Sequence, residues 1–356
     1  MIEKTKPQNI LIVGAGLAGI CVARRLHENQ IQFKIIDQGF NESSKVAAGV
    51  INPLVFRRTT KSWRVDEFLP VAVHFYTNLG KSWGNKYYEP IPIRRAFSHL
   101  QEKETWLERQ SWVDYLPYMK TIDEEDNKFT GVKNTFGTGV VLQAAHIHTI
   151  EFLNDAKTWF IENNLLLEKT FKYQDLNPEE ASYEGEKYDA IIFCEGYRGI
   201  ENPFFNYLPL EATKGEMLTV ESVEIPSEEL LNRKCFILPM GKNQFKVGAT
   251  YTWRSPNTEL TDDAKDLLFE QANTLVQAKM KIIDHQAGVR PTVLDRRPLI
   301  GEHPIYPKLK IFNGLGAKGY MMAPLLSQEF VSSLIGSEIL DKELDIERYK
   351  KRFVQQ

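Results

Sequence analysis

Short apolar runs and one stretch of helical periodicity alternate along the first forty residues. Residues Asn9–Val13 are mostly apolar, Leu17–Asn29 carry apolar side chains at helical spacing, and Phe33–Asp37 form a second mostly apolar run. Two such runs around a helix predict a βαβ unit with parallel strands and a right-handed crossover. The chain therefore starts with an element that is typical of α/β proteins.

A similar passage follows in the middle of the chain. Thr149 is placed to cap a helix that Asn163 and Asn164 end, and the apolar run 165–167 comes directly afterwards. The later segment YDAIIFCEG predicts a buried strand that closes on Gly196. We expect these pieces to join the same parallel sheet, which the chain leaves and re-enters. The apolar positions expected on one helix face are Phe152, Ala156, Trp159 and Phe160.

The pattern changes in the segments between and after these passages. In 87–143 and 210–251, short runs of β-forming residues alternate with proline, glycine and charged residues. The segment KCFILPMGKNQFKVGATY predicts a hairpin around Gly241, Lys242 and Asn243. These segments predict one antiparallel sheet in a second domain.

The last part of the chain returns to the first pattern. A strand is predicted at 310–313, then a glycine-rich turn, then a long helix from about Met322 to Leu340. The overall prediction is an α/β protein with a Rossmann-like nucleotide-binding domain on a parallel sheet and a second, α+β domain on an antiparallel sheet. We expect residues 1–86, 144–209 and 285–356 to form the first domain, and residues 87–143 and 210–284 to form the second.

Length and charge narrow the class of protein. A chain of 356 residues is long enough for two domains with large cores. Its formal net charge of −3 creates no global basic field, so nucleic acid is not an expected partner, although a local basic patch is compatible with this value. The first apolar run is too short and too rich in glycine for a signal peptide or a membrane span. We therefore expect a cytoplasmic protein without membrane contacts, and the oligomeric state is not predicted.

The three cysteines, Cys21, Cys194 and Cys235, lie far apart in the sequence. Their odd number and the lack of a CxxC pair indicate neither a disulfide framework nor a thiolate zinc site. We expect them to be reduced and buried as small apolar side chains.

The segment VGAGLAG carries the first chemical signal. Gly14 permits a tight turn, Gly16 lets the backbone approach a pyrophosphate, and Gly19 lets the helix pack on the sheet. The helix N-terminus attracts the phosphate charge. Asp37 ends the next strand, where its carboxylate can accept hydrogen bonds from ribose hydroxyls. A structural turn is the alternative for the glycines alone, but the whole order of strand, glycines, helix, strand and acid predicts binding of FAD or NAD rather than NADP.

Glycine-rich turns near the C-terminus favour the flavin. One lies close to Gly301, and the other spans 314–319 and precedes a helix predicted from about Met321, with Pro324 in its first turn. Glycines would let the backbone lie against a flat ring, and a helix N-terminus aimed at the ring would stabilise negative charge on its reduced form. The alternative is a second structural turn ahead of a helix.

Several segments together resemble the D-amino-acid oxidase superfamily of flavoproteins, which includes glycine oxidase and sarcosine oxidase. Their order and spacing along nearly the whole chain make the resemblance specific. The segment GLGAKGYMMAPLL is most similar to the FAD domain of the bifunctional tRNA methylaminomethyl-uridine biosynthesis enzyme. The matching segments are IVGAGLAG with Asp37, AAGVINP, YDAIIFCEG, KGEMLTV, FILP with KVGATY, VRPTVLDRRPLIG and GLGAKGYMMAP.

This resemblance implies FAD, a substrate domain built on a β-sheet, and oxidation of an amine to an imine by hydride transfer to the flavin. It places 47–49 under the flavin, and the turn at 314–318 beside the carbonyl edge of the ring. No cysteine lies where sarcosine oxidases attach their flavin, so we expect non-covalent FAD. The expected cofactor-binding residues are Gly14, Ala15, Gly16, Leu17, Ala18, Gly19, Asp37, Gln38, Ala47, Ala48, Gly49, Gly196, Gly314, Gly316, Ala317, Lys318 and Gly319.

Two cations are the candidates for a catalytic role. Arg290 resembles the arginine that holds the substrate carboxylate in amino-acid oxidases, and its alternative is an ion pair with Asp295 or another acid. Lys318 could stabilise reduced flavin or activate oxygen, and its alternative is a solvated surface charge.

Other polar and aromatic groups have weaker indications. A basic cluster follows the flavin segment and could meet an anionic substrate, or form a solvated face. Tyr251 and Trp253 could border the substrate pocket or pack in the core. His146 and His148 share one strand face, but the sequence offers no further ligands, so no metal site is assigned. Phe236 stands where amino-acid oxidases often place a tyrosine, which leaves the substrate class open. The basic cluster consists of Arg57, Arg58, Lys61 and Arg64.

Three functional hypotheses follow. The first is an FAD-dependent oxidoreductase that oxidises a small-molecule amine or amino acid and passes electrons to oxygen or another acceptor. The second is a tRNA-modifying flavoenzyme that acts on an aminomethyl-uridine. The third is a flavin-binding protein without catalytic activity.

Overall fold

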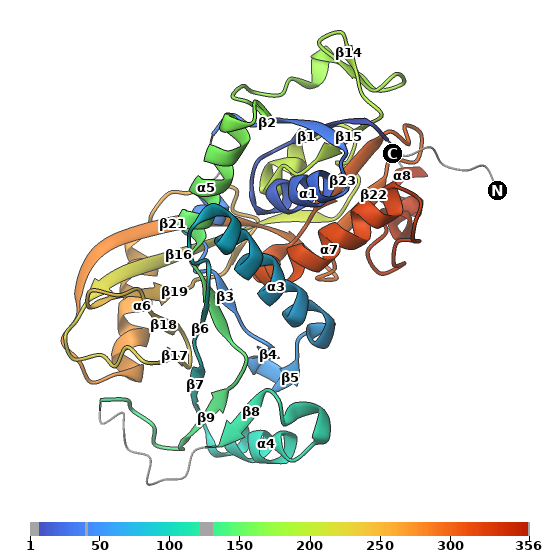
Figure 1. The fold of residues 1–356 in the computed structure, drawn as a ribbon. Helices are drawn as coiled ribbons and strands as arrows, with labels where there is room; N and C mark the ends of the chain where they lie inside the picture. The colour runs from blue at the N-terminus through green and yellow to red at the C-terminus, as the bar shows by residue number, and fades with distance from the viewer. Residues whose placement is uncertain (1–6, 40–41, 122–130, 355–356) are drawn as a thin grey trace.

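The computed structural model describes residues 7–39, 42–121 and 131–354. A six-stranded sheet combines strands from distant parts of the chain in the order β11-β2-β1-β15-β23-β22 (Figure 1). All neighbours in it pair in parallel except β22 and β23. The predicted βαβ unit is confirmed, as is the return of later segments to this sheet. The strands are β1 (Asn9–Val13), β2 (Gln32–Ile36), β11 (Leu166–Leu167), β15 (Ala190–Phe193), β22 (Leu299–Glu302) and β23 (Leu309–Asn313).

Both faces of this sheet are buried. Along β1, Ile10 and Ile12 belong to a core shared with helices α1, α3 and α7, whereas Leu11 and Val13 belong to a second core that is rich in aromatic residues. Near-continuous apolar strands are expected when a parallel sheet is covered on both sides. Helix α7 packs against α1 and α3 (Figure 1). These helices are α1 (Leu17–Glu28), α3 (Val65–Trp83) and α7 (Gly319–Leu334).

A larger, nine-stranded sheet forms the second part of the molecule. Its strands run in the order β20-β16-β19-β18-β17-β7-β9-β8, and β21 pairs with β16. The predicted hairpin is confirmed as β18 and β19, but the expectation of a purely antiparallel sheet is wrong, because β17 and β7 pair in parallel. These two strands lie far apart in the chain, so no local hairpin dictates their direction. The strands are β7 (Ile93–Ala96), β8 (Met119–Thr121), β9 (Thr138–Val141), β16 (Leu210–Glu221), β17 (Leu230–Asn232), β18 (Phe236–Pro239), β19 (Gln244–Gly248), β20 (Thr252–Trp253) and β21 (Lys281–Val293).

A small sheet in the order β3-β10-β6 lies between these two parts and leads into helix α5. Helix α5 carries Phe152, Ala156 and Phe160 on its buried side, as predicted. Its N-cap is His148 rather than Thr149, whose hydroxyl donates instead to the carbonyls of Lys45 and Ala47. The elements are β3 (Val50–Ile51), β6 (Tyr88–Pro90), β10 (Ala145–Ile147) and α5 (Thr149–Glu162).

The helix predicted to run from Met322 to Leu340 differs at both ends. It begins at Gly319 and ends at Leu334, so Pro324 lies in its second turn and not in its first. Pro324 cannot donate to the carbonyl of Tyr320 four residues earlier, and this carbonyl instead accepts a hydrogen bond from the Tyr76 hydroxyl at 2.9 Å.

Within the described ranges no helix is both long and apolar enough to cross a membrane. The remaining elements connect or flank these sheets and helices. They are α2 (Glu42–Val46), β4 (Leu54–Val55), η1 (Phe56–Arg58), β5 (Thr60–Lys61), α4 (Leu100–Gln110), η2 (Val113–Tyr115), η3 (Tyr173–Asp175), β12 (Leu176–Asn177), β13 (Ser182–Tyr183), β14 (Glu186–Lys187), η4 (Gly196–Glu201), α6 (Asp262–Leu275), η5 (Gly316–Lys318), η6 (Ile346–Tyr349) and α8 (Lys350–Val354).

Candidate functional site

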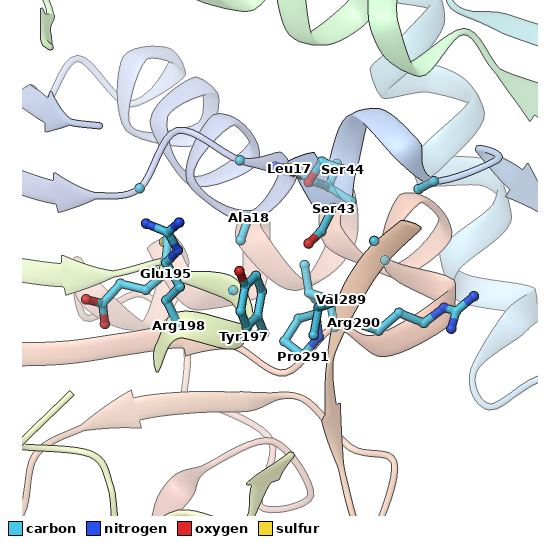
Figure 2. A pocket seen from close by; sticks show the side chains of 18 of the residues that line it. Leu17, Ala18, Ser43, Ser44, Glu195, Tyr197, Arg198, Val289, Arg290 and Pro291 are labelled. Atoms are coloured by element: carbon cyan, nitrogen blue, oxygen red, sulfur yellow. Dashed lines mark hydrogen bonds between the residues drawn. The ribbon is translucent and has the colours of Figure 1, made fainter. Parts of the chain in front are cut away.

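A cavity of about 500 Å³ lies beyond the carboxyl ends of the parallel strands, where open α/β sheets bind their ligands. Figure 2 shows it as elongated: Glu195 lies at one end and the Arg290 guanidinium at the other, with Leu17, Ser43 and Tyr197 between them. The lining comes from the first βαβ unit, from α2 and β3, from the segment after β15, and from β21 with the turn before α7. Segments that are distant in the sequence therefore form one extended site.

The glycine turn after β1 has the geometry that its sequence predicts. Gly14 has φ +104°, and a Cβ atom there would lie 2.5 Å from the carbonyl oxygen of Cys194. A Cβ atom on Gly19 would lie 1.9 Å from the carbonyl oxygen of Gly14, so both positions exclude side chains. Gly16 is the N-cap of α1 and provides no side-chain cap. The Leu17 amide donates a long hydrogen bond of 3.4 Å to the Ser44 hydroxyl, and the next N–H groups of α1 are left for an anionic ligand in the cavity.

Asp37 follows β2 and borders the cavity. Its Oδ2 accepts a hydrogen bond from the Ala15 amide at 2.5 Å, and its Oδ1 accepts one from the Gly39 amide at 2.6 Å. These two bonds orient the carboxylate and leave further lone pairs for ribose hydroxyls. The neighbouring Gln38 also borders the cavity, and its amide oxygen accepts a hydrogen bond from Thr170 at 3.0 Å.

The segment expected under the flavin passes close to β10. Gly49 has φ +65°, and a Cβ atom there would lie 2.2 Å from the carbonyl oxygen of Ile147. The Ile147 amide donates to the Gly49 carbonyl at 2.8 Å, which fixes the segment against the small sheet. Ala47 and Ala48 border the cavity beside it.

The turn before α7 meets the same cavity. Gly316, with φ +57°, Ala317 and Gly319 line it, and the N-terminus of α7 has no side-chain cap. Gly314 does not line it: a Cβ atom there would lie 2.6 Å from Val293, so this glycine serves packing. The cavity is thus bordered by two helix N-termini without a side-chain cap. One is that of α1, after the turn expected to bind the pyrophosphate, and the other is that of α7, after the turn expected beside the flavin ring.

Most of the expected cofactor-binding residues come together around the cavity, and three do not. Ala15, Gly314 and Lys318 are not part of its lining. Those that line it are Gly14, Gly16, Leu17, Ala18, Gly19, Asp37, Gln38, Ala47, Ala48, Gly49, Gly196, Gly316, Ala317 and Gly319.

Lys318 is half-buried with its ammonium group turned inward, which excludes the solvated surface charge as its alternative role. Its Nζ donates to the carbonyls of Asn52 at 2.7 Å and Leu54 at 3.2 Å, and to the hydroxyl of Ser62 at 2.6 Å. Burial lowers the pKa of Lys318 to about 8. We call residues 47–49, which are expected under the flavin, the flavin loop. All three donors of the ammonium group are therefore directed at residues 52–62, the segment after the flavin loop.

Arg290 lies in β21 with its guanidinium at the end of the cavity opposite Glu195 (Figure 2). It contacts the Thr250 carbonyl at 3.4 Å and lies 5.3 Å from the ring centre of Tyr251. Among the described residues no carboxylate pairs with it, and Asp295 pairs instead with Arg348 and Tyr349. Burial lowers the pKa of Arg290, but a guanidinium stays charged in proteins.

Sequence reasoning missed several residues of the lining. Met217 is one of them. It forms an apolar surface in front of Gly248 together with Phe236, which the sequence had already indicated, and a Cβ atom on Gly248 would lie 2.7 Å and 2.8 Å from their side chains. Glu195 borders the opposite end, accepts hydrogen bonds from Tyr173 at 2.5 Å and Asn202 at 2.8 Å, and has its pKa raised by burial to about 7. The acid in CEG was visible in the sequence, but nothing indicated that it would be buried.

The basic cluster, the two aromatic candidates and the cysteines differ in how exposed they are and in what they contact. In the basic cluster, Lys61 pairs with Asp66 and Arg64 pairs with Glu329, whereas Arg57 is exposed, as is Arg58. The aromatic pair Tyr251 and Trp253 is each 41% exposed, so the core-packing alternative is wrong for both. The three cysteines are free and buried, as expected, and Cys194 borders the cavity.

Comparison with known proteins identifies the family. Residues 9–332 match the model of the DAO family, described as FAD dependent oxidoreductase. The chain belongs to this family. It is therefore an FAD-dependent oxidoreductase, and the cavity with its two uncapped helix N-termini, its glycine turn and Asp37 fits FAD.

Relatives and solved structures agree with this assignment. A tRNA 5-methylaminomethyl-2-thiouridine biosynthesis bifunctional protein of Legionella pneumophila (strain Philadelphia 1) is 22% identical over 92% of this chain and 54% of its own length. Glycine oxidase of Bacillus subtilis is 31% identical over 41% of this chain and 38% of its own length. The structure of glycine oxidase from Geobacillus kaustophilus superposes with a TM-score of 0.79 at 17% identity, covering 97% of this chain and 98% of that one. This chain thus has the fold of a glycine oxidase and spans about half the length of the bifunctional relatives that it matches.

Proposed function

We propose that this chain oxidises the C–N bond of an amine that carries a carboxylate, such as an amino acid or an N-substituted amino acid, to the imine. The observation that supports this proposal is the half-buried Arg290 guanidinium, which faces the cavity without an acidic partner in the described chain. A carboxylate is the ligand whose two oxygens match the guanidinium fork. A substrate held in this way would place its amine further into the cavity.

The reaction removes a hydride from the carbon and a proton from the nitrogen of the substrate. FAD, when bound, accepts the hydride. Met217 and Phe236 give the cavity an apolar surface, which disfavours an ammonium ion and so favours the neutral amine whose C–H bond can be broken. The carboxylates that line the cavity, Asp37, Glu195 and Glu201, follow strands β2 and β15 and do not contact Arg290. The protein's part is therefore to orient the substrate and to exclude water.

Anaerobic titration tests this proposal. The FAD-loaded protein would be mixed with a panel of amino acids, N-substituted amino acids and amines without a carboxylate, and bleaching of the flavin band would be followed. We expect bleaching by one carboxylate-bearing class. Arg290→Met should raise the concentration needed for half-maximal bleaching by at least about tenfold, the effect of losing one charge-assisted interaction. A flavin that no amine reduces would instead identify a binding protein without catalytic activity.

Reoxidation then identifies the electron acceptor. The substrate-reduced protein would be mixed with oxygen or with an artificial acceptor, and return of the flavin band would be timed. Fast return with oxygen indicates an oxidase, and return only with the artificial acceptor indicates a dehydrogenase.

A second candidate is action on an aminomethyl-uridine of tRNA. Two observations favour it: the bifunctional tRNA-modifying relatives align over 92% of this chain, and Arg57 and Arg58 are exposed beside the flavin loop. Binding of tRNA that weakens steeply between low and moderate salt, and weakens again in an Arg57→Ala, Arg58→Ala double variant, would support it.

A further inference from the structure

Three side chains of the type that bind metals meet outside the cavity. Glu89 lies in β6, His146 in β10, and His148 at the start of α5. His146 is directly opposite Glu89 in the antiparallel pair of β10 and β6, and His148 follows two residues later. Opposed residues and residues two apart project from the same face of a strand pair. The ligand atoms of all three lie within 4.8 Å of one another.

Within this cluster, His148 contacts Glu89, whereas the imidazole of His146 has no hydrogen-bond partner among the described residues. His148 Nε2 lies 2.9 Å from Glu89 Oε2, and the rings of His146 and His148 are 4.7 Å apart between their centres. The His146 side chain is 4% exposed, and within the described ranges no hydrogen bond to it is found. The lone pair of this imidazole therefore has no protein donor in the described chain, and a cation could accept it.

We propose that Glu89, His146 and His148 bind a divalent first-row transition-metal cation, with water in the remaining coordination positions. Neutral imidazoles and a carboxylate are ligands that Zn²⁺ uses, and three protein ligands with an open position are a common set. Ligand atoms about 2.0–2.2 Å from such an ion lie about 3.3 Å apart in a tetrahedral site. The 2.9 Å contact therefore has to open by only a few tenths of an ångström. The side chains of His148 and Glu89 are 29% and 44% exposed, so an ion can reach the site from solvent.

The position of the cluster indicates what the ion would do. Val50 is opposite His146 in the β3–β10 pair, and Val50 also lines the cavity. Gly49, one residue earlier, accepts a hydrogen bond from Ile147. An ion bound to the cluster would join β6, β10 and the start of α5 directly behind the flavin loop. Its expected role is structural, and the proposal is independent of the identity of the substrate.

One charge opposes the site. Lys246 in β19 is buried, its charge acts to lower the pKa of His146, and within the described chain it forms no ion pair. An ammonium group repels a divalent cation. Replacing it with an apolar side chain of similar length should therefore strengthen metal binding.

Zinc competition on the tag-free, FAD-loaded protein tests the proposal. After removal of metals with a chelator, Zn²⁺ would be titrated in the presence of a chromophoric zinc chelator. We expect one zinc per chain, because the three cysteines are buried and unavailable. His146→Ala and His148→Ala should each weaken zinc binding by at least about tenfold. Substituting a residue that only supports a metal ligand already weakens metal binding by about this factor. His74→Ala, at an exposed histidine on α3, is the matched control and should leave zinc binding unchanged.

Two further variants distinguish the loss of a metal ligand from a general loss of protein stability. Lys246→Met should tighten zinc binding severalfold, which a merely destabilised protein would not do. If His146→Ala fails to retain FAD, Glu89→Gln decides, because it keeps the shape of a partly exposed side chain and removes only its charge. Unchanged zinc affinity in the ligand variants, or no zinc binding by the parent protein, overturns the proposal.

Discussion

The guanidinium of Arg290 lies directly over the α-carbon of Gly215 in the neighbouring strand. A Cβ atom on Gly215 would lie 2.3 Å from both Nη atoms of Arg290. Strands β16 and β21 pair with Thr213 opposite Arg290, so Gly215 is two residues along the same face. The glycine in KGEMLTV is thus explained by the space that the guanidinium needs, because no other residue would leave it free.

Gly215→Ala should displace this guanidinium. The clash involves the end of a flexible side chain, so we expect the free energy of unfolding to change by less than about 1 kcal/mol. The KM for a carboxylate-bearing substrate should rise by at least about tenfold, because the guanidinium fork no longer meets both oxygens. Steady-state kinetics on FAD-loaded protein measures this, and an amine without a carboxylate is the control. An equal rise in KM for both substrates would contradict the role of Gly215 as the space for Arg290.

Gly14→Ala should prevent retention of FAD. The new Cβ atom would lie 2.5 Å from the backbone oxygen of Cys194, directly after β15. The Cys194 amide is bonded to the Val13 carbonyl at 2.8 Å, so this backbone cannot move without disturbing the parallel sheet. Gly185→Ala is a matched control, since its φ of +86° imposes similar backbone strain but no atom lies within 4 Å of the new Cβ. That control should lose about 1–3 kcal/mol of stability and keep FAD. Flavin absorbance of the purified proteins reads out both, and a yellow Gly14→Ala protein would contradict the assigned turn.

The sequence predicted the parts of this structure that depend on local pattern. The βαβ unit, the hairpin at 236–248 and the glycine turns follow from spacing and from turn residues, and the structure contains them. The parallel pairing of β17 with β7 was not predictable, because it joins segments more than a hundred residues apart. The same limit applies to the cluster around His146: its third member, Glu89, lies 57 residues earlier and meets it only through strand pairing.

Burial was the other property that the sequence did not reveal. A lysine such as Lys318 is usually exposed, and an acid such as Glu195 usually ionised. Here the charged groups of both residues are enclosed because distant segments pack around them, although each residue as a whole is only half-buried. Both therefore have shifted pKa values.

Glu195→Gln should remove a decrease in the free energy of unfolding that the parent protein shows as the pH rises toward 7. Burial raises the pKa of Glu195 from its usual 4.5 to about 7, although hydrogen bonds from Tyr173 and Asn202 act in the opposite direction. The folded protein therefore keeps this proton up to about pH 7, while the unfolded chain releases it near pH 4.5. The stabilising contribution is complete below pH 4.5 and is lost as the pH rises to 7, by at most about 3 kcal/mol.

Urea unfolding at pH 5 and pH 7.5 measures this effect. The stability of the parent protein relative to the glutamine variant should fall across this interval. Glu162→Gln, at an exposed glutamate on α5, is the control and should show no such trend. A constant difference between parent and Glu195→Gln would mean that Glu195 is already ionised in the folded protein.

Lys318→Met should remove a second pH dependence of stability, one that runs in the opposite direction to that of Glu195. Burial lowers the pKa of Lys318 to about 8 from its usual 10.5. Between these values the unfolded chain holds the proton and the folded protein does not, so the parent becomes more stable relative to the variant as the pH rises from 8 to 10.5. The gain is at most about 3 kcal/mol. Lys308→Met, at an exposed lysine, should show no such gain.

The same variant distinguishes between two roles of Lys318. Its three hydrogen bonds end on Asn52, Leu54 and Ser62, and it does not line the cavity, so its removal should loosen the segment after the flavin loop. We therefore expect weaker retention of FAD, with reoxidation of the flavin that remains bound changing less than about threefold. A reoxidation rate that falls by orders of magnitude in fully loaded protein would show instead that the ammonium group acts on oxygen or on the reduced ring.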